Sequence, residues 1–165
     1  MLEVLKCAAD YKLPEWIAAL GALGTLSGVW FVWKQLQLSK EIARLQFVDG
    51  LDKEYRELAS DIPTKALLGS DLEAEEHQKI FDELFRYFDL SNRQAALWKE
   101  KRIDSASWNN WRTGIGFNLQ LPAFARAWGE VKLRTEDHAS EFFSELRSLE
   151  ESGFSPNWPR GGKDA

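Results

Sequence analysis

The chain has 165 residues, a formal net charge of −5 and a pI near 5.2. This length fits one ordinary domain, and the acidic balance argues against nucleic acid as a partner, because neutralising phosphates requires an excess of Lys and Arg. The single cysteine, Cys7, cannot form an internal disulfide, which excludes a small secreted module held by disulfides.

The first predicted element is an uncharged helix over residues 16–33. No charged residue occurs from Ile17 to Trp33, and these seventeen residues would span roughly 26 Å as a helix, within the range of membrane-crossing helices. A buried helix of a soluble bundle is the alternative, but such helices usually keep a polar stripe, and this one offers only Thr25 and Ser27. We therefore expect a transmembrane helix here.

Tryptophans stand at both ends of this helix. Trp16 begins it, and Trp30 and Trp33 lie near its other end, directly before Lys34. Tryptophan suits the headgroup region because its apolar ring carries an N–H donor, so these four residues are the expected membrane-interface anchors. Residues 1–15 are then a short N-terminal tail. A cleaved signal peptide is the weaker alternative, because no small-residue cleavage pattern follows.

Basic residues set the expected orientation of the helix. Lys34, Lys40 and Arg44 follow it, against Lys6 and Lys12 before it. Because cytoplasmic flanks carry the excess of Lys and Arg, we expect the C-terminal domain on the cytoplasmic side.

Small residues within the same segment have the spacing of a helix-association motif. Gly24 and Gly28 are four residues apart, and Gly21 extends the side without bulky side chains. Two such helices can approach closely, so the spacing predicts a homo-oligomer through the transmembrane helix. A monomeric anchor with ordinary glycine content is the alternative.

Residues 34–62 are expected to continue the same helix until Pro63 ends it. Apolar residues recur there in steps of three and four, which is typical of one side of a helix. We expect this stripe to pack on the chain's own domain, and an inter-subunit coiled coil is the alternative. The stripe comprises Leu38, Ile42, Leu45, Val48, Leu51, Tyr55 and Leu58.

Residues 63–152 are predicted to form a cytoplasmic helical domain, followed by a flexible tail over residues 153–165 in which Trp158 could dock. Strand signals are nearly absent from the sequence. The expected fold class is therefore all-α, with one N-terminal transmembrane helix continuing into a cytoplasmic bundle of about four to five helices.

Helix start and stop signals divide this domain. Ser70 and Glu73 have the spacing of a capping box, and Asp104 or Ser105 can cap a later helix. Pro122 suits a first helical turn. Gly153 is a natural helix stop.

Motifs of known enzyme classes are absent from the sequence. It holds no glycine-rich phosphate loop ending in Lys-Ser or Lys-Thr, and Cys7 is distant along the chain from His77 and His138. We therefore expect a non-enzymatic protein without catalytic residues, cofactor or metal. An enzyme whose site is assembled from dispersed residues is the alternative.

One group of residues has the composition of a ligand site. Trp108 and Trp111 are three residues apart on one predicted helix face, with Asn109 and Arg112 beside them. Aromatic rings can stack on a base, and a guanidinium can hold a phosphate or carboxylate. These four residues are the candidate site for a small anionic ligand, and core packing of the tryptophans is the alternative.

The phrases "FDELFRYFDLSNRQAALWKEKRIDSASWNNWRTGI" and "PAFARAW" resemble uncharacterised bacterial proteins with one spanning helix and a small helical cytoplasmic domain. The resemblance covers about residues 16–149 and depends on aromatic-rich phrases. It implies an address in the bacterial inner membrane, and some relatives of such families are suggested to act in phage defence. It implies no catalytic residue.

These observations predict a membrane-anchored, non-enzymatic interaction or regulatory module. One role that it could have is that of an oligomeric effector of a stress response or of phage defence. The expected partners are the lipid bilayer, further copies of the chain and a protein partner, since tethering raises local concentration. A membrane-tethered sensor of a small anionic or nucleotide ligand is the alternative function.

Overall fold

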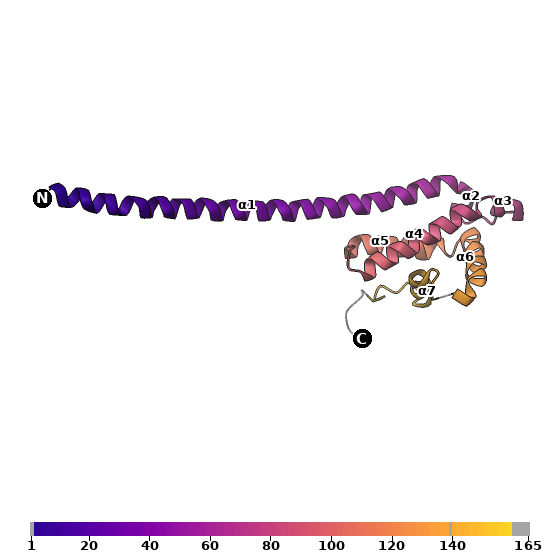
Figure 1. The fold of residues 1–165 in the computed structure, drawn as a ribbon. Coiled ribbons are helices and arrows are strands. Elements are labelled where there is room, and N and C mark those ends of the chain that lie inside the picture. The colour runs from indigo at the N-terminus through magenta and orange to yellow at the C-terminus, as the bar shows by residue number, and fades with distance from the viewer. Residues whose placement is uncertain (1, 139, 160–165) are drawn as a thin grey trace. The chain divides into compact units, whose positions relative to one another are not determined.

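Helices dominate the computed structural model, which describes residues 2–138 and 140–159, with side chains from Ser27 onward. The described residues contain no strand, so the all-α prediction is confirmed (Figure 1). They form seven α-helices and one 3-10 turn, and six of these α-helices follow α1, more than the four to five helices expected in the bundle. In chain order these are α1 (Leu2–Asp61), α2 (Thr64–Leu67), α3 (Ala74–Lys79), α4 (Phe81–Lys99), α5 (Ser105–Asn118), α6 (Pro122–Arg134), the 3-10 turn η1 (Glu136–His138) and α7 (Ser144–Glu151).

The predicted transmembrane helix over residues 16–33 is wrong, and so is the bacterial inner-membrane address that depended on it. Within the described part of the chain, no helix joins the length and the apolar character that crossing a bilayer requires. The side chains of residues 1–26 lie outside the described part.

The chain divides into two compact units, residues 1–46 and residues 47–165. We call the second unit the domain; it contains the last turns of α1 and every later helix. α1 runs without a break through the predicted boundaries at residues 15 and 33 and ends at Asp61, one residue before the predicted end of the extension. The domain therefore begins earlier in the chain than residue 63.

Three predicted helix ends are confirmed. The carboxylate of Asp104 accepts hydrogen bonds from the backbone N–H groups of Ala106 and Ser107, both at 3.0 Å, and so satisfies two donors at the start of α5. Pro122 occupies the first turn of α6, where its missing N–H breaks no helical bond. Gly153 follows α7 with a φ of 64°, a left-handed conformation that suits glycine.

The predicted capping box of Ser70 and Glu73 does not form. α3 begins at Ala74, and Glu73 lies at its N-cap position without a side-chain hydrogen bond. The carboxylate of Asp71 instead accepts a hydrogen bond from the backbone N–H of Leu72 at 2.8 Å. This local bond offers the backbone an alternative to the helix, so the helix starts later than the sequence pattern indicates.

The core of the domain is built around α4, which packs against α5, α6 and α7. Its buried face carries aromatic rings that meet rings of α6. The ring centroids of Tyr87 and Phe124 are 5.1 Å apart, and those of Phe88 and Trp128 are also 5.1 Å apart. Tilted and edge-on contacts of this kind add to the stabilisation that burial of large rings provides.

Part of the predicted flexible tail is packed in this core. Trp158 is only 3% exposed, and its ring stacks on that of Trp108 with centroids 5.5 Å apart. Trp108 stacks in turn on Trp98, also at 5.5 Å. The Trp98 indole N–H donates to the backbone carbonyl of Trp158 at 3.4 Å. Aromatic contacts therefore hold the chain in place at Trp158, and residues 160–165 lie outside the described part.

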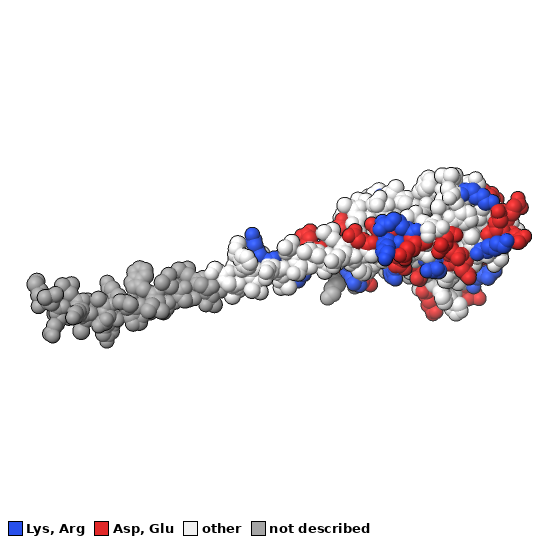
Figure 2. All heavy atoms as spheres, turned by 90° about the horizontal axis from the view of Figure 1, so that it is seen from above, with Lys and Arg blue, Asp and Glu red and all other residues white. Residues whose placement is uncertain are grey.

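Acidic and basic side chains alternate over the face of the domain that Figure 2 displays. Lys65 and Glu76 form an ion pair at 2.7 Å, and Lys132 and Glu150 form one at 2.9 Å. The hydrogen bond from Lys65 holds the pKa of Glu76 below its usual range. Because charges of both signs are mixed on this face, it offers no concentrated basic patch of the kind that binds phosphate backbones.

Candidate functional site

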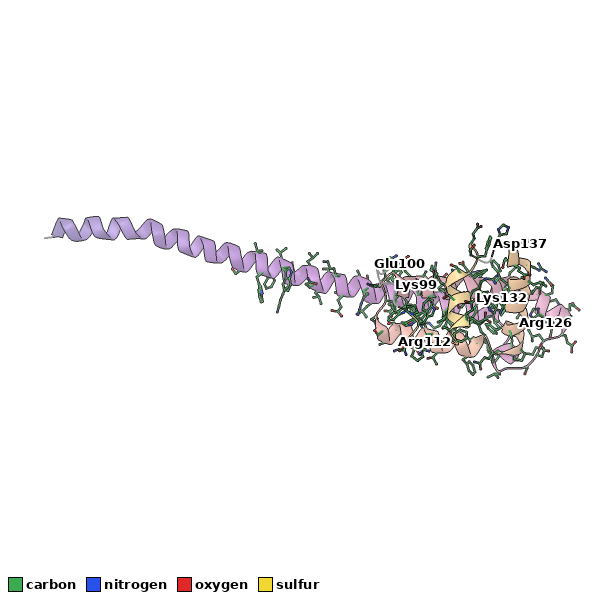
Figure 3. All side chains as sticks on the ribbon, turned by 90° about the horizontal axis from the view of Figure 1, so that it is seen from below. Lys99, Glu100, Arg112, Arg126, Lys132 and Asp137 are labelled. Carbon is green, nitrogen blue, oxygen red and sulfur yellow. The ribbon has the colours of Figure 1, made fainter. Side chains whose placement is uncertain are left out.

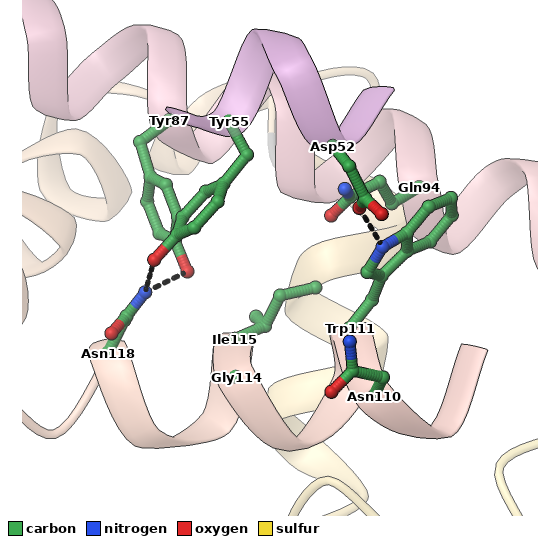
Figure 4. A pocket seen from close by; sticks show the side chains of 9 residues that line it. All are labelled: Asp52, Tyr55, Tyr87, Gln94, Asn110, Trp111, Gly114, Ile115 and Asn118. Atoms are coloured by element: carbon green, nitrogen blue, oxygen red, sulfur yellow. Dashed lines mark hydrogen bonds between the residues drawn. The ribbon is translucent and has the colours of Figure 1, made fainter. Parts of the chain in front are cut away.

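A pocket of about 190 Å³ lies in the domain between the last turns of α1, α4 and α5 (Figure 4). This volume is below the roughly 300–1,000 Å³ of pockets for drug-sized ligands. It exceeds the approximately 150 Å³ of an engineered cavity that holds one benzene ring. The pocket is lined by Asp52, Tyr55, Tyr87, Gln94, Asn110, Trp111, Gly114, Ile115 and Asn118.

One end of the pocket is fixed by a hydrogen bond between α1 and α5. The indole N–H of Trp111 donates to Oδ1 of Asp52 at 2.7 Å, while the Trp111 ring is 7% exposed. A charge-assisted bond of this length is strong and directional. It holds the carboxylate and the indole in a fixed relation. The second carboxylate oxygen, Oδ2, makes no hydrogen bond within the described residues.

The other end of the pocket is formed by two tyrosines and an amide. The Asn118 side-chain NH₂ donates to the hydroxyl of Tyr87 at 3.1 Å and lies 3.5 Å from that of Tyr55. The two tyrosine rings have centroids 6.1 Å apart. Burial raises the pKa of Tyr87 above its ordinary value, so its hydroxyl stays protonated as a donor.

Gln94 on α4 is a buried polar side chain whose amide has no partner in the part of the chain that the structure describes. It is only 5% exposed, and it lines the pocket beside Asp52 (Figure 4). Buried amides in folded proteins are nearly always hydrogen-bonded to protein or to water. An unpaired amide at a pocket wall is therefore available to whatever fills the pocket.

The structure separates the four residues predicted to form an anion site. Trp111 lines the pocket, whereas Trp108 is 1% exposed inside the tryptophan stack. Arg112 lies on α5 (Figure 3), and its guanidinium donates to the backbone carbonyl of Phe154. The side chain of Asn109 is exposed to solvent. Of the four, Trp111 alone reaches the pocket, so a combined aromatic and cationic site does not arise there.

The pocket residues outside α5 were missed by the sequence analysis. Asp52 and Gln94 are separated from Trp111 by 59 and 17 residues of chain, and each looks like an ordinary polar position of an amphipathic helix. A buried glutamine on the apolar side of α4 is the signal that could have been noticed, because polar residues on that side need a partner.

The structure describes only some of the residues predicted as membrane-interface anchors and helix-association positions. Trp30 and Trp33 are 54% and 55% exposed, and the Lys34 ammonium lies 4.7 Å from the Trp30 ring centroid. A Cβ added at Gly28 would meet nothing within 4 Å. The remaining positions have side chains outside the described part: Trp16, Gly21 and Gly24.

A run of exposed apolar side chains covers α1 before the domain. We call residues 27–46 the arm. Nine of its large apolar residues are exposed, from 46% for Ile42 to 65% for Val32. Protein surfaces in contact with water rarely expose so many large apolar side chains together, and such patches usually mark interaction sites. The nine are Val29, Trp30, Phe31, Val32, Trp33, Leu36, Leu38, Ile42 and Leu45.

No grouping of three or more His, Cys, Asp or Glu side chains suited to a metal ion occurs among the described residues. His77 is buried, and its Nε2 lies 3.1 Å from the Ala123 carbonyl oxygen, so it links α3 to α6. His138 is exposed and lies 3.8 Å from Glu141.

Comparison with known proteins yields no match among family models, curated proteins or solved structures. The resemblance to bacterial single-helix proteins, and the role in stress or phage defence that it implies, therefore stay predictions.

Proposed function

We propose that the protein is a non-enzymatic interaction module that self-associates through the arm. The single observation that carries the proposal is the exposure of nine large apolar side chains along one uninterrupted helix. Residues 47–159 form a well-packed core of their own. The chain therefore joins a folded domain to a helix whose exposed apolar side chains can contact a partner.

The spacing of apolar residues on the arm fits another helix as the occupant. Phe31, Leu38, Ile42 and Leu45 are separated by seven, four and three residues, which is the repeat of a coiled-coil seam. We call these four residues the arm seam. All four are 46–62% exposed, so the seam is uncovered within the described residues.

A second copy of the chain is the partner that the arm seam fits best. Every copy carries the same seam, and a two-fold interface places identical patches against each other, so apolar surface necessarily meets apolar surface. The four seam side chains offer on the order of 400 Å² of apolar area, taking roughly 100 Å² for each half-exposed side chain. Stable interfaces bury about 800 Å² on each partner, so the apolar residues that flank the seam must contribute as well.

The charges of the arm permit this assembly. The arm carries only a small excess of positive charge, because it contains three basic residues and one acidic residue: Lys34, Lys40, Arg44 and Glu41. Arg44 lies 3.9 Å from Glu41 on the same helix, which offsets part of it. Repulsion between exposed charges is screened within about 8 Å at physiological salt, so it does not outweigh the apolar contacts.

Sedimentation of the full chain tests the proposal. We expect the parent to sediment as a multiple of 18.9 kDa. Leu38→Glu and Ile42→Glu should weaken association by about 100-fold or more, because each places an unpaired carboxylate in an apolar contact. Leu133→Glu on α6 is the matched control, since Leu133 is also exposed, at 73%, but lies outside the arm.

The outcomes separate clearly. A control that associates like the parent, with both arm variants at the mass of one chain, supports the proposal. A parent that stays at the mass of one chain over the whole concentration range contradicts it. So does an equal loss of association in Leu133→Glu, because exposed leucines in general would then be responsible.

A further inference from the structure

We propose that the pocket between α1, α4 and α5 is a binding site for a compact organic cation, an ammonium or amidinium group attached to a single ring. This inference goes beyond self-association through the arm. It depends on a different part of the chain, because every lining residue belongs to residues 47–159.

The charge of the pocket selects the sign of the ligand. Its lining contains one carboxylate, Asp52, and no Lys or Arg. Arg56, one turn after Asp52 on α1, is exposed. Three other cations near the pocket are engaged elsewhere, and one of them, Lys53, pairs with Glu57 at 3.6 Å. Arg93 pairs with Glu54, and Arg112 donates to a backbone carbonyl outside the pocket. An anion would meet an uncompensated negative charge here, whereas a cation would complete an ion pair.

Two polar groups in the pocket wall are free to bind a ligand. Oδ1 of Asp52 is used by the Trp111 indole, but Oδ2 remains available as an acceptor. The Gln94 side chain is 5% exposed, and its amide makes no hydrogen bond among the described residues. The amide oxygen can therefore accept a hydrogen bond from an N–H group of the ligand. An ammonium or amidinium carries at least two N–H donors, so it can satisfy both groups at once.

Aromatic rings form the rest of the wall and favour the same ligand. Trp111, Tyr55 and Tyr87 all line the pocket (Figure 4). The faces of such rings attract cations through their quadrupole, and they bury the apolar body that carries the charge. The cavity volume of about 190 Å³ limits that body to about the size of one ring.

Part of the pocket wall is exposed to solvent. Asn110 and Gly114 on α5 are exposed, and Tyr55 is 37% exposed. Gln94 is buried at the inner wall and Asp52 is half-buried, whereas the two exposed α5 residues lie at the opening. A ligand enters with its charged group first and leaves its ring against the tyrosines and the tryptophan.

Calorimetric titration of the full chain with three ring compounds of one size tests the inference. The probes are benzylammonium, neutral benzyl alcohol and anionic benzoate at neutral pH. We expect benzylammonium to bind the parent at least tenfold more tightly than either of the others. Asp52→Asn should remove this preference while keeping an acceptor oxygen for the Trp111 indole, and so the pocket itself.

Two further variants keep the test decisive. Asp49→Asn removes an exposed carboxylate one turn earlier on α1 and should bind benzylammonium like the parent. Gln94→Glu adds a second carboxylate to the wall and should tighten binding about tenfold, which is informative even where Asp52→Asn folds poorly. In the parent, benzylammonium should also shift the NMR signal of the Trp111 indole N–H.

Three results would overturn the inference. One is equal affinity of the parent for benzylammonium and benzyl alcohol. Another is an equal loss of affinity for benzylammonium in Asp49→Asn and Asp52→Asn, which would indicate that the ligand is attracted to net charge alone. The third is a Trp111 indole signal that does not respond to saturating benzylammonium.

Discussion

Replacing Trp158 by alanine tests whether the C-terminal segment is part of the domain core. The Trp158 ring is 3% exposed, stacks on Trp108 at 5.5 Å and lies 5.3 Å from the Lys99 ammonium. Its indole N–H also donates to the Ser148 hydroxyl at 3.3 Å. Truncation of a buried tryptophan to alanine costs about 3–5 kcal/mol. We expect about 3 kcal/mol, the lower end of this range.

Urea unfolding of the full chain, followed by far-UV circular dichroism at one fixed protein concentration, measures this loss. With a slope of about 2 kcal/mol/M, the midpoint of the domain transition should fall by roughly 1.5 M. Phe117→Ala is the control, because Phe117 is 62% exposed and its loss should change stability by about 0.5 kcal/mol or less. If Trp158→Ala unfolds at the same midpoint as this control, the segment does not contribute to the core and the reasoning is refuted.

Three further predictions about the domain can be tested by the same unfolding assay. Asp104→Ala removes the side-chain cap of α5 and should cost about 1 kcal/mol; an unchanged midpoint would show that the cap is not used. Gly116→Ala places a Cβ 3.0 Å from a ring carbon of Phe154 and should lower the free energy of unfolding by about 1–3 kcal/mol. At Gly114 an added Cβ meets nothing within 4 Å, so Gly114→Ala should raise the free energy of unfolding by up to about 1 kcal/mol. Equal effects of the two glycine variants would place Phe154 elsewhere. Burial raises the pKa of Tyr87, so above about pH 10 the unfolded chain loses this proton before the folded chain does, and stability falls. The drop in midpoint between about pH 9 and about pH 11 should therefore be smaller in Tyr87→Phe than in the parent, and an equal drop in both would count against a buried hydroxyl.

Features decided by neighbouring residues could be predicted from the sequence. The cap at Asp104, the first-turn proline at 122 and the stop at Gly153 each depend on residues within one helical turn. Local geometry of this kind is encoded in short patterns. The capping box at Ser70 failed for a local reason too, because the Asp71 side chain binds the backbone first.

The apolar stripe of α1 was predicted as one face but is divided. Val48 and Leu51 are 9% and 5% exposed in the domain core, whereas Ile42 and Leu45 are about half exposed. From Ile42 to Leu51 the stripe advances in three successive steps of three residues. A helix turns by 100° per residue, so each step covers about 300° and shifts the stripe by about 60° around α1. The two ends of the stripe therefore lie on different sides of α1.

Features that join distant parts of the chain could not be read from the sequence. Asp52 and Trp111 meet across 59 residues, and Trp98 and Trp158 across 60. The sequence places Gln94 on the apolar side of α4, but it does not show that the Gln94 amide faces a cavity. The predicted anion site shows the same limit, because spacing places Arg112 near Trp111 along the helix but does not show that the Arg112 guanidinium donates to the Phe154 carbonyl.

Alkylation of single cysteines on the arm tests self-association most directly. In a Cys7→Ser background, Ile42→Cys lies in the arm seam, and Lys40→Cys lies about 200° away around the same helix. We predict that the rate of Ile42→Cys with a bulky maleimide falls as protein concentration rises, while the rate of Lys40→Cys stays constant. Equal rates for both cysteines at every concentration would contradict the proposed function, because a seam that never becomes covered joins no second copy.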